Sequence, residues 1–454
     1  MSEIKTRITK GTTWLAVSKV AMQVIAIGYL FVLLNNLSLT EYALVKLAFS
    51  IPALLGFFSL SGITPVLISD LSSSKKESDI TTIRYTLSSF FTLRFLLAII
   101  ASLVLLLSTY LTAGWFRPEI ISMVQLLALD FLLGPIYSFI ILTLTLRQKF
   151  GQLALFNVFE EFFKLGFVIL LVISFNLNAF GVILSYVLTQ LLLIIVFSYS
   201  LLAFRREWLG GKFFSKGLLN PLYCVRLHAK WAVVLGGVVS FSSNIRVWIV
   251  QLVLGTQAVA IYSLAITLLQ PLIGLIPISS VLAPILPIYK DRPSLIARFV
   301  AAAVKYVVVL HLILVLGAVI VLPIMLNLFF PNYVAAFGLF VFLALGMLPK
   351  LCSQIVGLLS HVYKMQINLL TGSLLNLLLI IVLLPVSLYV FGIYGAAVEL
   401  FFTQVVYLIG RYTVIKKFVP NFSLPWRDLI SITQEDFWLF TKLKNRLVNI
   451  LPTK

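Results

Sequence analysis

Long stretches of the chain contain no charged residue, and they constrain the fold more than any other feature. Residues 306–349 and 365–398 hold no Asp, Glu, Lys or Arg, and about 20 apolar residues in a helix cross the roughly 30 Å hydrocarbon layer of a bilayer. The whole chain is 61% hydrophobic and only 11% charged, whereas soluble domains have about a quarter charged residues. The runs are too long and too little alternating for barrel strands. The sequence therefore predicts an all-α polytopic membrane protein.

Breaks between the apolar runs predict about twelve membrane-spanning helices. They are expected near residues 12–35, 42–69, 83–110, 120–146, 153–175, 179–203, 231–254, 258–288, 299–326, 333–359, 365–390 and 393–415. Lys and Arg gather in short cytoplasmic connections. Every second connection here, beginning with the N-terminal segment, is basic, whereas the others carry only Arg117. Both termini are therefore expected in the cytoplasm. The formal net charge of +19 follows from membrane topology, and no nucleic-acid partner is needed to explain it.

A basic, polar segment at residues 204–230 separates the first six predicted helices from the last six. The predicted organisation is a bundle at 1–203, this cytoplasmic loop, a second bundle at 231–415 and a tail at 416–454. The tail mixes apolar and basic residues, which favours an amphipathic helix on the inner membrane surface. Weak similarity between the segments that begin at Leu37 and Leu254 suggests a duplicated transporter. Shared membrane composition is the alternative explanation.

Three segments carry a resemblance to a known family. They are "GTTWLAVSKVAMQVIAIGYLFVLLNNLSLTEYALVKLAFSI" near the start, "LGTQAVAIYSLA" in the second half, and "HVYKMQINLLTGSLLNLLLIIVLLPVSLYVFGIYGAAVEL" near the end. Together they resemble the polysaccharide-flippase branch, the O-antigen flippase (Wzx) type, of the multidrug/oligosaccharidyl-lipid/polysaccharide (MOP) exporter superfamily. The resemblance extends from residue 10 to about 417. The chain departs from the family at Ala43 and Ala260, where glycine is usual, and at Arg246, near which an acidic residue is common.

The resemblance implies both a fold and a function. The fold would be two six-helix bundles around a central cavity. The function would be translocation of an undecaprenyl-diphosphate-linked oligosaccharide, such as an O-antigen unit of lipopolysaccharide, from the cytoplasmic to the periplasmic leaflet of the bacterial inner membrane. Membrane lipids and polysaccharide-assembly proteins are the further partners that it implies.

Charged residues inside the predicted spans are the strongest functional signal, because a charge at membrane depth is costly and usually functional. Among them we select seven bases and four acids, a surplus of three positive charges. Guanidinium and ammonium groups bind phosphate oxygens, so a cavity of this sign favours an anionic ligand. The bases are Arg246, Lys19, Arg94, Lys350, Lys164, Lys46 and Lys305; the possible charge partners are Asp130, Glu160, Glu161 and Glu399; a polar cavity lining for sugars is predicted from Asn244, Gln23, Gln251, Gln354 and Asn376.

Three of these lysines have an alternative role. Lys46 and Lys305 lie within one or two turns of a predicted helix end, so their long side chains can extend to the membrane interface. Lys164 follows Glu161 and Glu160 by three and four positions. This spacing places the three side chains on one helix face and favours an internal ion pair over ligand contact.

Arg246 lies about fifteen residues into its predicted helix and is the strongest candidate for substrate contact. The alternative is a buried ion pair with Asp130 or Glu399 that holds two helices together. Lys350 follows Pro349, and a proline inside a helix removes a hydrogen bond and kinks it. The sequence therefore places a hinge beside a cation.

Three functions compete. A flippase for lipid-linked oligosaccharide needs an anion-binding cavity, and an ion-coupled drug exporter of the same fold needs carboxylates in its first or seventh helix, where residues 12–35 and 231–254 have none. A membrane glycan polymerase needs a large outer loop with catalytic residues, and the predicted outer segments are short. There is no phosphate-binding glycine loop, and Cys224 and Cys352 lack metal-ligand spacing. The sequence thus favours a flippase without catalytic residues, metal or cofactor, and leaves the sugar, the oligomeric state and the coupling ion, H⁺ or Na⁺, open.

Overall fold

The structure is a computed structural model that describes residues 2–60, 62–64, 67–68, 71, 80–111, 118–208, 220–223, 230–274, 282, 286, 292–363 and 365–419. The regular secondary structure of these residues is helical. Nine helical segments among them are long and apolar enough to cross a membrane. Helices are the spanning form in which each backbone donor finds its acceptor within the same segment. The predicted all-α membrane fold is confirmed.

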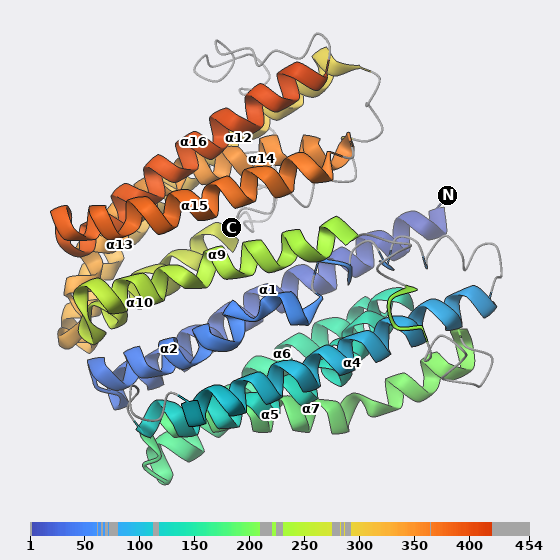
Figure 1. The fold of residues 1–454 in the computed structure, drawn as a ribbon, viewed down its shortest axis with the longest axis horizontal. Coiled ribbons are helices and arrows are strands. Elements are labelled where there is room, and N and C mark those ends of the chain that lie inside the picture. Colours follow the sequence, from blue (N-terminus) through green and yellow to red (C-terminus); the bar gives the residue numbers. More distant parts are fainter. Residues whose placement is uncertain are drawn as a thin grey trace, which may run out of the picture.

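The first half of the chain forms one bundle, coloured blue to green in Figure 1. Its helices are α1 (Ser2–Asn36), α2 (Leu39–Leu54), α4 (Ile80–Leu111), α5 (Pro118–Leu146), α6 (Phe150–Val168) and α7 (Asn178–Trp208). A 3₁₀ turn, η1 (Gly56–Ser59), follows α2, and a π-helical turn, η2 (Ile169–Ser174), extends α6. Helix α1 packs along α6, while α5 packs between α4 and α7.

The second half forms the other bundle, coloured lime to red in Figure 1. Its helices are α9 (Lys230–Leu254), α10 (Thr256–Gly274), α12 (Pro293–Phe329), α13 (Ala335–Gly346), α14 (Leu348–Val362), α15 (Gln366–Phe391) and α16 (Gly395–Phe418). Short turns, η5 (Pro331–Tyr333) and η6 (Gly392–Tyr394), connect α12 to α13 and α15 to α16. Helix α15 packs against α9 and α16, and α14 packs against α16.

The predicted span at 333–359 is two helices rather than one. It breaks at Met347, between α13 and α14 and just before Pro349, as expected where proline removes a backbone donor. The buried ring of His311 donates from Nε2 to the Ala344 carbonyl oxygen next to this break, at 2.9 Å. The break lies three residues before Lys350, so the cation stands in the first turn of α14.

The two bundles meet along α2, which contacts both α9 and α10. The Ser240 hydroxyl of α9 donates to the Ala53 carbonyl oxygen at 2.7 Å, and a Cβ at Gly237 would lie 3.0 Å from the Phe57 side chain. The largest hydrophobic core cluster contains residues of both bundles. We call this contact the α2 seam. The domain boundaries at 204–230 and 416 stay predictions, because most of that loop and all of residues 420–454 of the tail lie outside the described residues.

The turns at one end of the two bundles are tied together by Tyr333. Its hydroxyl donates to the Leu37 carbonyl oxygen at 3.1 Å, and its ring meets the Tyr42 ring edge to face, with centroids 5.9 Å apart. Leu37 precedes Ser38, which caps α2 in a reciprocal capping box with Glu41. The N-terminus of α2 is therefore fixed by its own capping box and by Tyr333 of the second bundle.

We expect Tyr333→Phe to lower the free energy of unfolding by about 1–3 kcal/mol, because the Leu37 carbonyl loses the donor of a buried hydrogen bond. Thermal unfolding of the detergent-purified protein measures the change. Tyr389→Phe is the matched control, since Tyr389 is 87% exposed and its hydroxyl should contribute little. Equal stability of the two variants would contradict this role for Tyr333.

Candidate substrate-binding site

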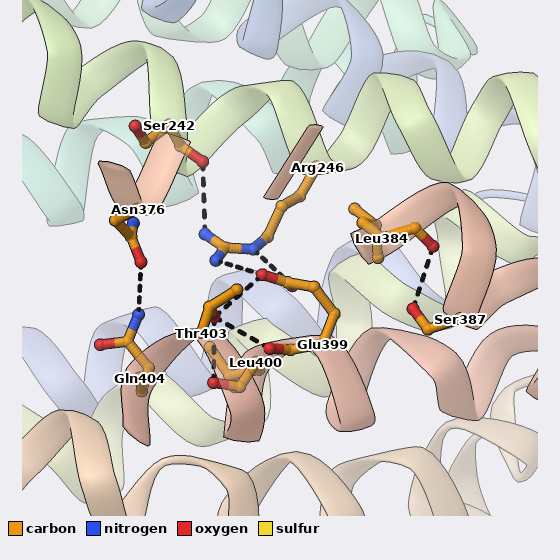
Figure 2. Close-up of polar contacts among 9 residues, drawn as sticks. All are labelled: Ser242, Arg246, Asn376, Leu384, Ser387, Glu399, Leu400, Thr403 and Gln404. Carbon is orange, nitrogen blue, oxygen red and sulfur yellow. Dashed lines mark hydrogen bonds and ion pairs between the residues drawn. The ribbon is translucent and has the colours of Figure 1, made fainter. Parts of the chain in front are cut away.

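Arg246 and Glu399 form a buried ion pair between α9 and α16 (Figure 2). The Arg246 Nε and Nη2 atoms donate to the two carboxylate oxygens of Glu399, each at 3.0 Å. Nη1 donates to the Ser242 carbonyl oxygen at 3.3 Å, and the Thr403 hydroxyl donates to Glu399 at 3.0 Å. The Glu399 side chain is 0% exposed and that of Arg246 is 13% exposed. Paired donors make this a strong geometry, so Arg246 is neutralised by one of the two partners that the sequence proposed.

A polar cavity of about 180 Å³ lies beside this pair, between α9, α14, α15 and α16. Two further cations, Lys350 and Arg411, line it together with Arg246. We call it the cationic pocket; its polar lining is completed by Ser242, Ser243, Ser353, Gln354, Ser373, Asn376, Gln404 and Tyr407. Glu399 is the carboxylate that neutralises one of its three cations. These four groups leave a net charge of +2, which favours an anionic ligand.

Arg411 is held in place by α14 and by its own helix. Its Nη1 atom donates to the Ser353 carbonyl oxygen at 2.7 Å, and Nη2 donates to the Tyr407 hydroxyl at 2.6 Å. The guanidinium carbon lies 4.1 Å from the centroid of the Tyr407 ring, a cation–π distance. Within the described part of the chain, neither Arg411 nor Lys350 forms an ion pair with a carboxylate. Their charges are therefore available to a ligand.

The sequence analysis did not select Arg411. It lies four residues before the predicted end of the last span at 415, where a long basic side chain is expected to reach the interface. In the structure α16 continues to Phe418, and the guanidinium turns inward against Gly357 of α14. A Cβ at Gly357 would lie 2.8 Å from the Arg411 Cζ atom. The available signal was the four-residue spacing of Tyr407 and Arg411, which places both on one helix face.

Gly357→Ala should displace the Arg411 guanidinium and reduce transport several-fold. The added methyl occupies the space that the guanidinium now fills, although alanine itself favours a helix by about 1 kcal/mol over glycine. Gly410→Ala is the matched control, because a Cβ there meets nothing within 4 Å and should leave transport unchanged. The transport rate per unit of membrane-inserted protein measures both. Unchanged transport in Gly357→Ala would show that the close packing around Arg411 is unimportant.

A second cavity, of about 320 Å³, lies at the α2 seam. Arg94 of α4 and Asp130 of α5 both line it, and Ser240 contributes from α9. The Arg94 guanidinium lies 5.8 Å from the Phe90 ring centroid. Arg94 and Asp130 form no ion pair with each other. The structure therefore does not place Arg94 or Asp130 in the cationic pocket, and Asp130 is not the partner of Arg246.

Lys164 has the internal ion pairs that its spacing indicated. Its Nζ atom lies 2.9 Å from a Glu161 carboxylate oxygen and 3.9 Å from one of Glu160. It also lies 5.0 Å from the centroid of the Tyr186 ring, and the Tyr137 hydroxyl donates to Glu160 at 2.7 Å. Lys164 is thus enclosed by its own helix and α5 and α7, away from the cationic pocket.

The other predicted bases lie elsewhere. Lys46 donates to the Thr267 hydroxyl of α10 at 3.2 Å, which links the bundles. Lys305 is half-buried on α12, 6.0 Å from the Tyr306 ring centroid. Lys19 is exposed on α1 and does not line either cavity. These three lysines therefore do not meet at one site.

Two of the five predicted polar residues lie at the cationic pocket. Gln354 lines it, and Asn376 lines it while accepting a hydrogen bond from Gln404 at 3.3 Å. Asn244 donates to the Ser240 carbonyl oxygen within α9 at 2.8 Å. Gln251 donates to the Thr256 hydroxyl at 3.1 Å near the turn between α9 and α10. Gln23 is half-buried on α1, outside both linings.

The fold is similar to those of solved transporters. An inward-facing multidrug resistance MATE family transporter of the MOP superfamily matches with a TM-score of 0.69 and 12% identity, over 89% of this chain and 100% of that chain. The lipid II flippase MurJ, in an inward closed conformation, matches with a TM-score of 0.69 and 12% identity, over 98% of this chain and 94% of that one. A MOP superfamily transporter from Pyrococcus furiosus, described by the reverse polarity of its binding pocket, matches with a TM-score of 0.60 and 12% identity, over 89% and 94%.

At these identities the structural matches show the fold alone, which is the MOP transporter fold of two helical bundles. No curated protein sequence matches the chain. A family model described as "Polysaccharide biosynthesis protein" matches residues 8–290, which is more than half of the chain and includes the first bundle from residue 8 onward, α9 and α10. This multi-pass membrane protein therefore belongs to the polysaccharide biosynthesis protein family.

Proposed function

We propose that the protein is a flippase that carries an undecaprenyl-diphosphate-linked oligosaccharide, an O-antigen unit or a related surface-polysaccharide repeat, across the bacterial inner membrane. The observation that supports this proposal is the cationic pocket, in which Lys350 and Arg411 have no carboxylate partner in the described part of the chain. Two such charges at membrane depth are unfavourable without an anion. A diphosphate supplies that anion, and its oxygens match the donors of guanidinium and ammonium groups.

The polar residues of the pocket suit the rest of such a substrate. Hydroxyl and amide side chains such as Ser373, Asn376 and Gln404 both donate and accept hydrogen bonds, as sugar hydroxyls do. The family description, polysaccharide biosynthesis, points to the same substrate class. A cationic drug would meet repulsion in this pocket, which disfavours the drug exporter as a function.

The mechanism that we propose is alternating access, with the substrate moving from the cytoplasmic to the periplasmic side. With both termini cytoplasmic, as the basic connections favour, the turns tied by Tyr333 face the periplasm. The α2 seam is the contact along which the bundles would rearrange. An inside-negative membrane potential assists the outward movement of an anionic head. In this scheme Lys350 and Arg411 hold the diphosphate, Arg246 positions the wall of the pocket, and exposed Lys19 meets substrate on its way in.

Reconstitution tests the proposal directly. Proteoliposomes are loaded with a polyprenyl-diphosphate N-acetylglucosamine that carries a fluorophore on its sugar, and dithionite quenches the outer leaflet. We expect the quenched fraction to rise with protein, and a matched polyprenyl alcohol glycoside without diphosphate to move far more slowly. Ethidium efflux from the same vesicles is the control for drug export. Ethidium movement without movement of the diphosphate lipid would overturn the proposal in favour of a drug exporter.

A further inference from the structure

The cavity at the α2 seam is distinct from the cationic pocket and has different chemistry. Its wall combines one guanidinium, Arg94, and one carboxylate, Asp130, with the aromatic rings of Phe49, Phe131 and Tyr186. A volume of about 320 Å³ is within the usual range of roughly 300–1,000 Å³ for small-molecule sites, which combine apolar walls with a few polar groups. The cavity therefore has the size and composition of a ligand site.

Its two charged groups lack partners within the described part of the chain. Asp130 Oδ1 is buried and accepts no hydrogen bond, and Arg94 forms neither an ion pair nor a hydrogen bond there. Most buried polar groups are paired, whereas the buried Asp130 oxygen is not, and the partly buried Arg94 faces the same cavity without bonding to it. The missing partner of each is expected to come from what occupies the cavity.

The chemistry of the two groups selects the ligand class. A guanidinium only donates hydrogen bonds, and an ionised carboxylate only accepts them. A simple anion would be attracted by Arg94 and repelled by Asp130. A simple cation would be attracted by Asp130 and repelled by Arg94. A hydroxyl does both, because it donates to the carboxylate and accepts from the guanidinium.

The aromatic part of the wall supports the same class. The Phe49 and Tyr186 rings meet edge to face, with centroids 5.0 Å apart, and Phe131 lines the cavity beside Asp130. Such rings bury the apolar face of a ligand while polar groups fix its edge. A sugar ring has this construction, with an apolar C–H face and a rim of hydroxyls.

We propose that the α2-seam cavity is a saccharide subsite, in which Asp130 and Arg94 hold the hydroxyls of one sugar ring against Phe131 and Tyr186. This inference rests on the proposed flippase function and divides the substrate between the bundles. The diphosphate lies in the cationic pocket of the second bundle, and one sugar of the glycan lies in the first. Ser240 of α9 lines this cavity, so movement of the bundles at the α2 seam changes the subsite.

Saturation-transfer NMR tests the subsite on the full-length protein in nanodiscs. The probes are methyl α-glucoside, methyl α-galactoside and N-acetylglucosamine at millimolar concentration. We expect saturation transfer to at least one of them. In Asp130→Asn and in Arg94→Gln the affinity for that sugar should be weaker by about tenfold or more, as expected when a hydrogen bond to a charged group is lost. Ala98→Leu, one turn from Arg94 on the same cavity wall, should block binding by filling the space, without removing a polar group.

The cationic pocket supplies the matched controls. Lys350→Gln and Arg411→Gln should keep the sugar signal and lose binding of inorganic pyrophosphate, measured by thermal shift. A wild-type protein without any sugar signal overturns the subsite. Normal sugar binding by folded Asp130→Asn, Arg94→Gln and Ala98→Leu variants also overturns it. If the wild-type protein still binds pyrophosphate and flips the lipid, the proposed function stays intact. A wild-type protein that neither binds pyrophosphate nor flips the lipid instead refutes the proposed function.

Discussion

Arg411→Gln and Lys350→Gln should each slow movement of a diphosphate lipid by about ten- to a hundredfold, and the double variant should stop it. Each substitution removes a hydrogen bond from a charged group, which contributes about 1.5–3 kcal/mol, and every 1.4 kcal/mol is a factor of ten. The effect is large because neither cation has a carboxylate partner in the described part of the chain. No carboxylate in that part of the chain therefore competes with the substrate for their charges. Initial rates in the dithionite assay measure the change.

The same helix provides the control. Lys417 lies six residues beyond Arg411 near the end of α16 and is exposed, so Lys417→Gln removes one positive charge without touching the cationic pocket. Its transport rate should equal that of the wild type. A comparable loss in Lys417→Gln would mean that net charge matters rather than the pocket, and full activity in Arg411→Gln and Lys350→Gln would refute the assignment of the diphosphate.

Thermal unfolding separates binding from folding in these variants. Gln keeps part of the side chain and a hydrogen-bonding amide, so Arg411→Gln should retain contact with Tyr407 and unfold close to the wild-type temperature. Added pyrophosphate should raise the unfolding temperature of the wild type, because a ligand that binds only the folded state stabilises it. That increase should be absent from the double variant.

The fold could be predicted from the sequence because membrane helices depend on local composition. Uncharged runs such as residues 306–349 require a span, and most of the observed helices lie in the predicted ranges. Two ranges differ: α2 ends at Leu54, inside the predicted span 42–69, and the span 333–359 divides into α13 and α14. Pro349 even indicated the break between α13 and α14. Both the spans and the break depend on residues that are close together in the sequence, so one sequence is enough to predict them.

The site could be predicted only in part, because it depends on contacts between distant segments. The sequence showed that Arg246 is deep, but only the packing of α9 near α16 selects Glu399 over Asp130 as its partner. Arg411 was missed because its proximity to a span end suggested the interface, whereas Gly357 on another helix creates the space that turns it inward. Lys164 was the exception, because its partners lie three and four positions away on the same helix.

Arg246 and the two unpaired cations should therefore respond differently to substitution. The charge of Arg246 is already satisfied by Glu399, and its pairing is bidentate and buried. A ligand that bound this guanidinium would have to displace Glu399, and the displaced carboxylate would stay buried without a partner. We accordingly propose that Arg246 supports transport by holding α9 and α16 together at the pocket wall.

Glu399→Gln should destabilise the protein by about 3–5 kcal/mol, the usual loss when one member of a buried ion pair is removed and the other charge stays. Glutamine nearly matches glutamate in shape, so the loss reflects the charge of Arg246 rather than a cavity. Thermal unfolding in detergent measures it. The double variant Arg246→Met/Glu399→Met should recover most of the stability, because replacing both members with apolar side chains of similar size is often neutral or stabilising.

Transport by that double variant then decides the role of Arg246. If Arg246 only supports the pocket wall, the stable double variant should still move the diphosphate lipid at a rate within several-fold of the wild type, since Lys350 and Arg411 remain. A stable double variant without transport would instead make Arg246 a direct substrate contact, released from Glu399 when the anion arrives. Glu399→Gln with unchanged stability would contradict the pairing itself, because an uncompensated guanidinium buried between α9 and α16 has no other carboxylate in the described residues within ion-pair distance.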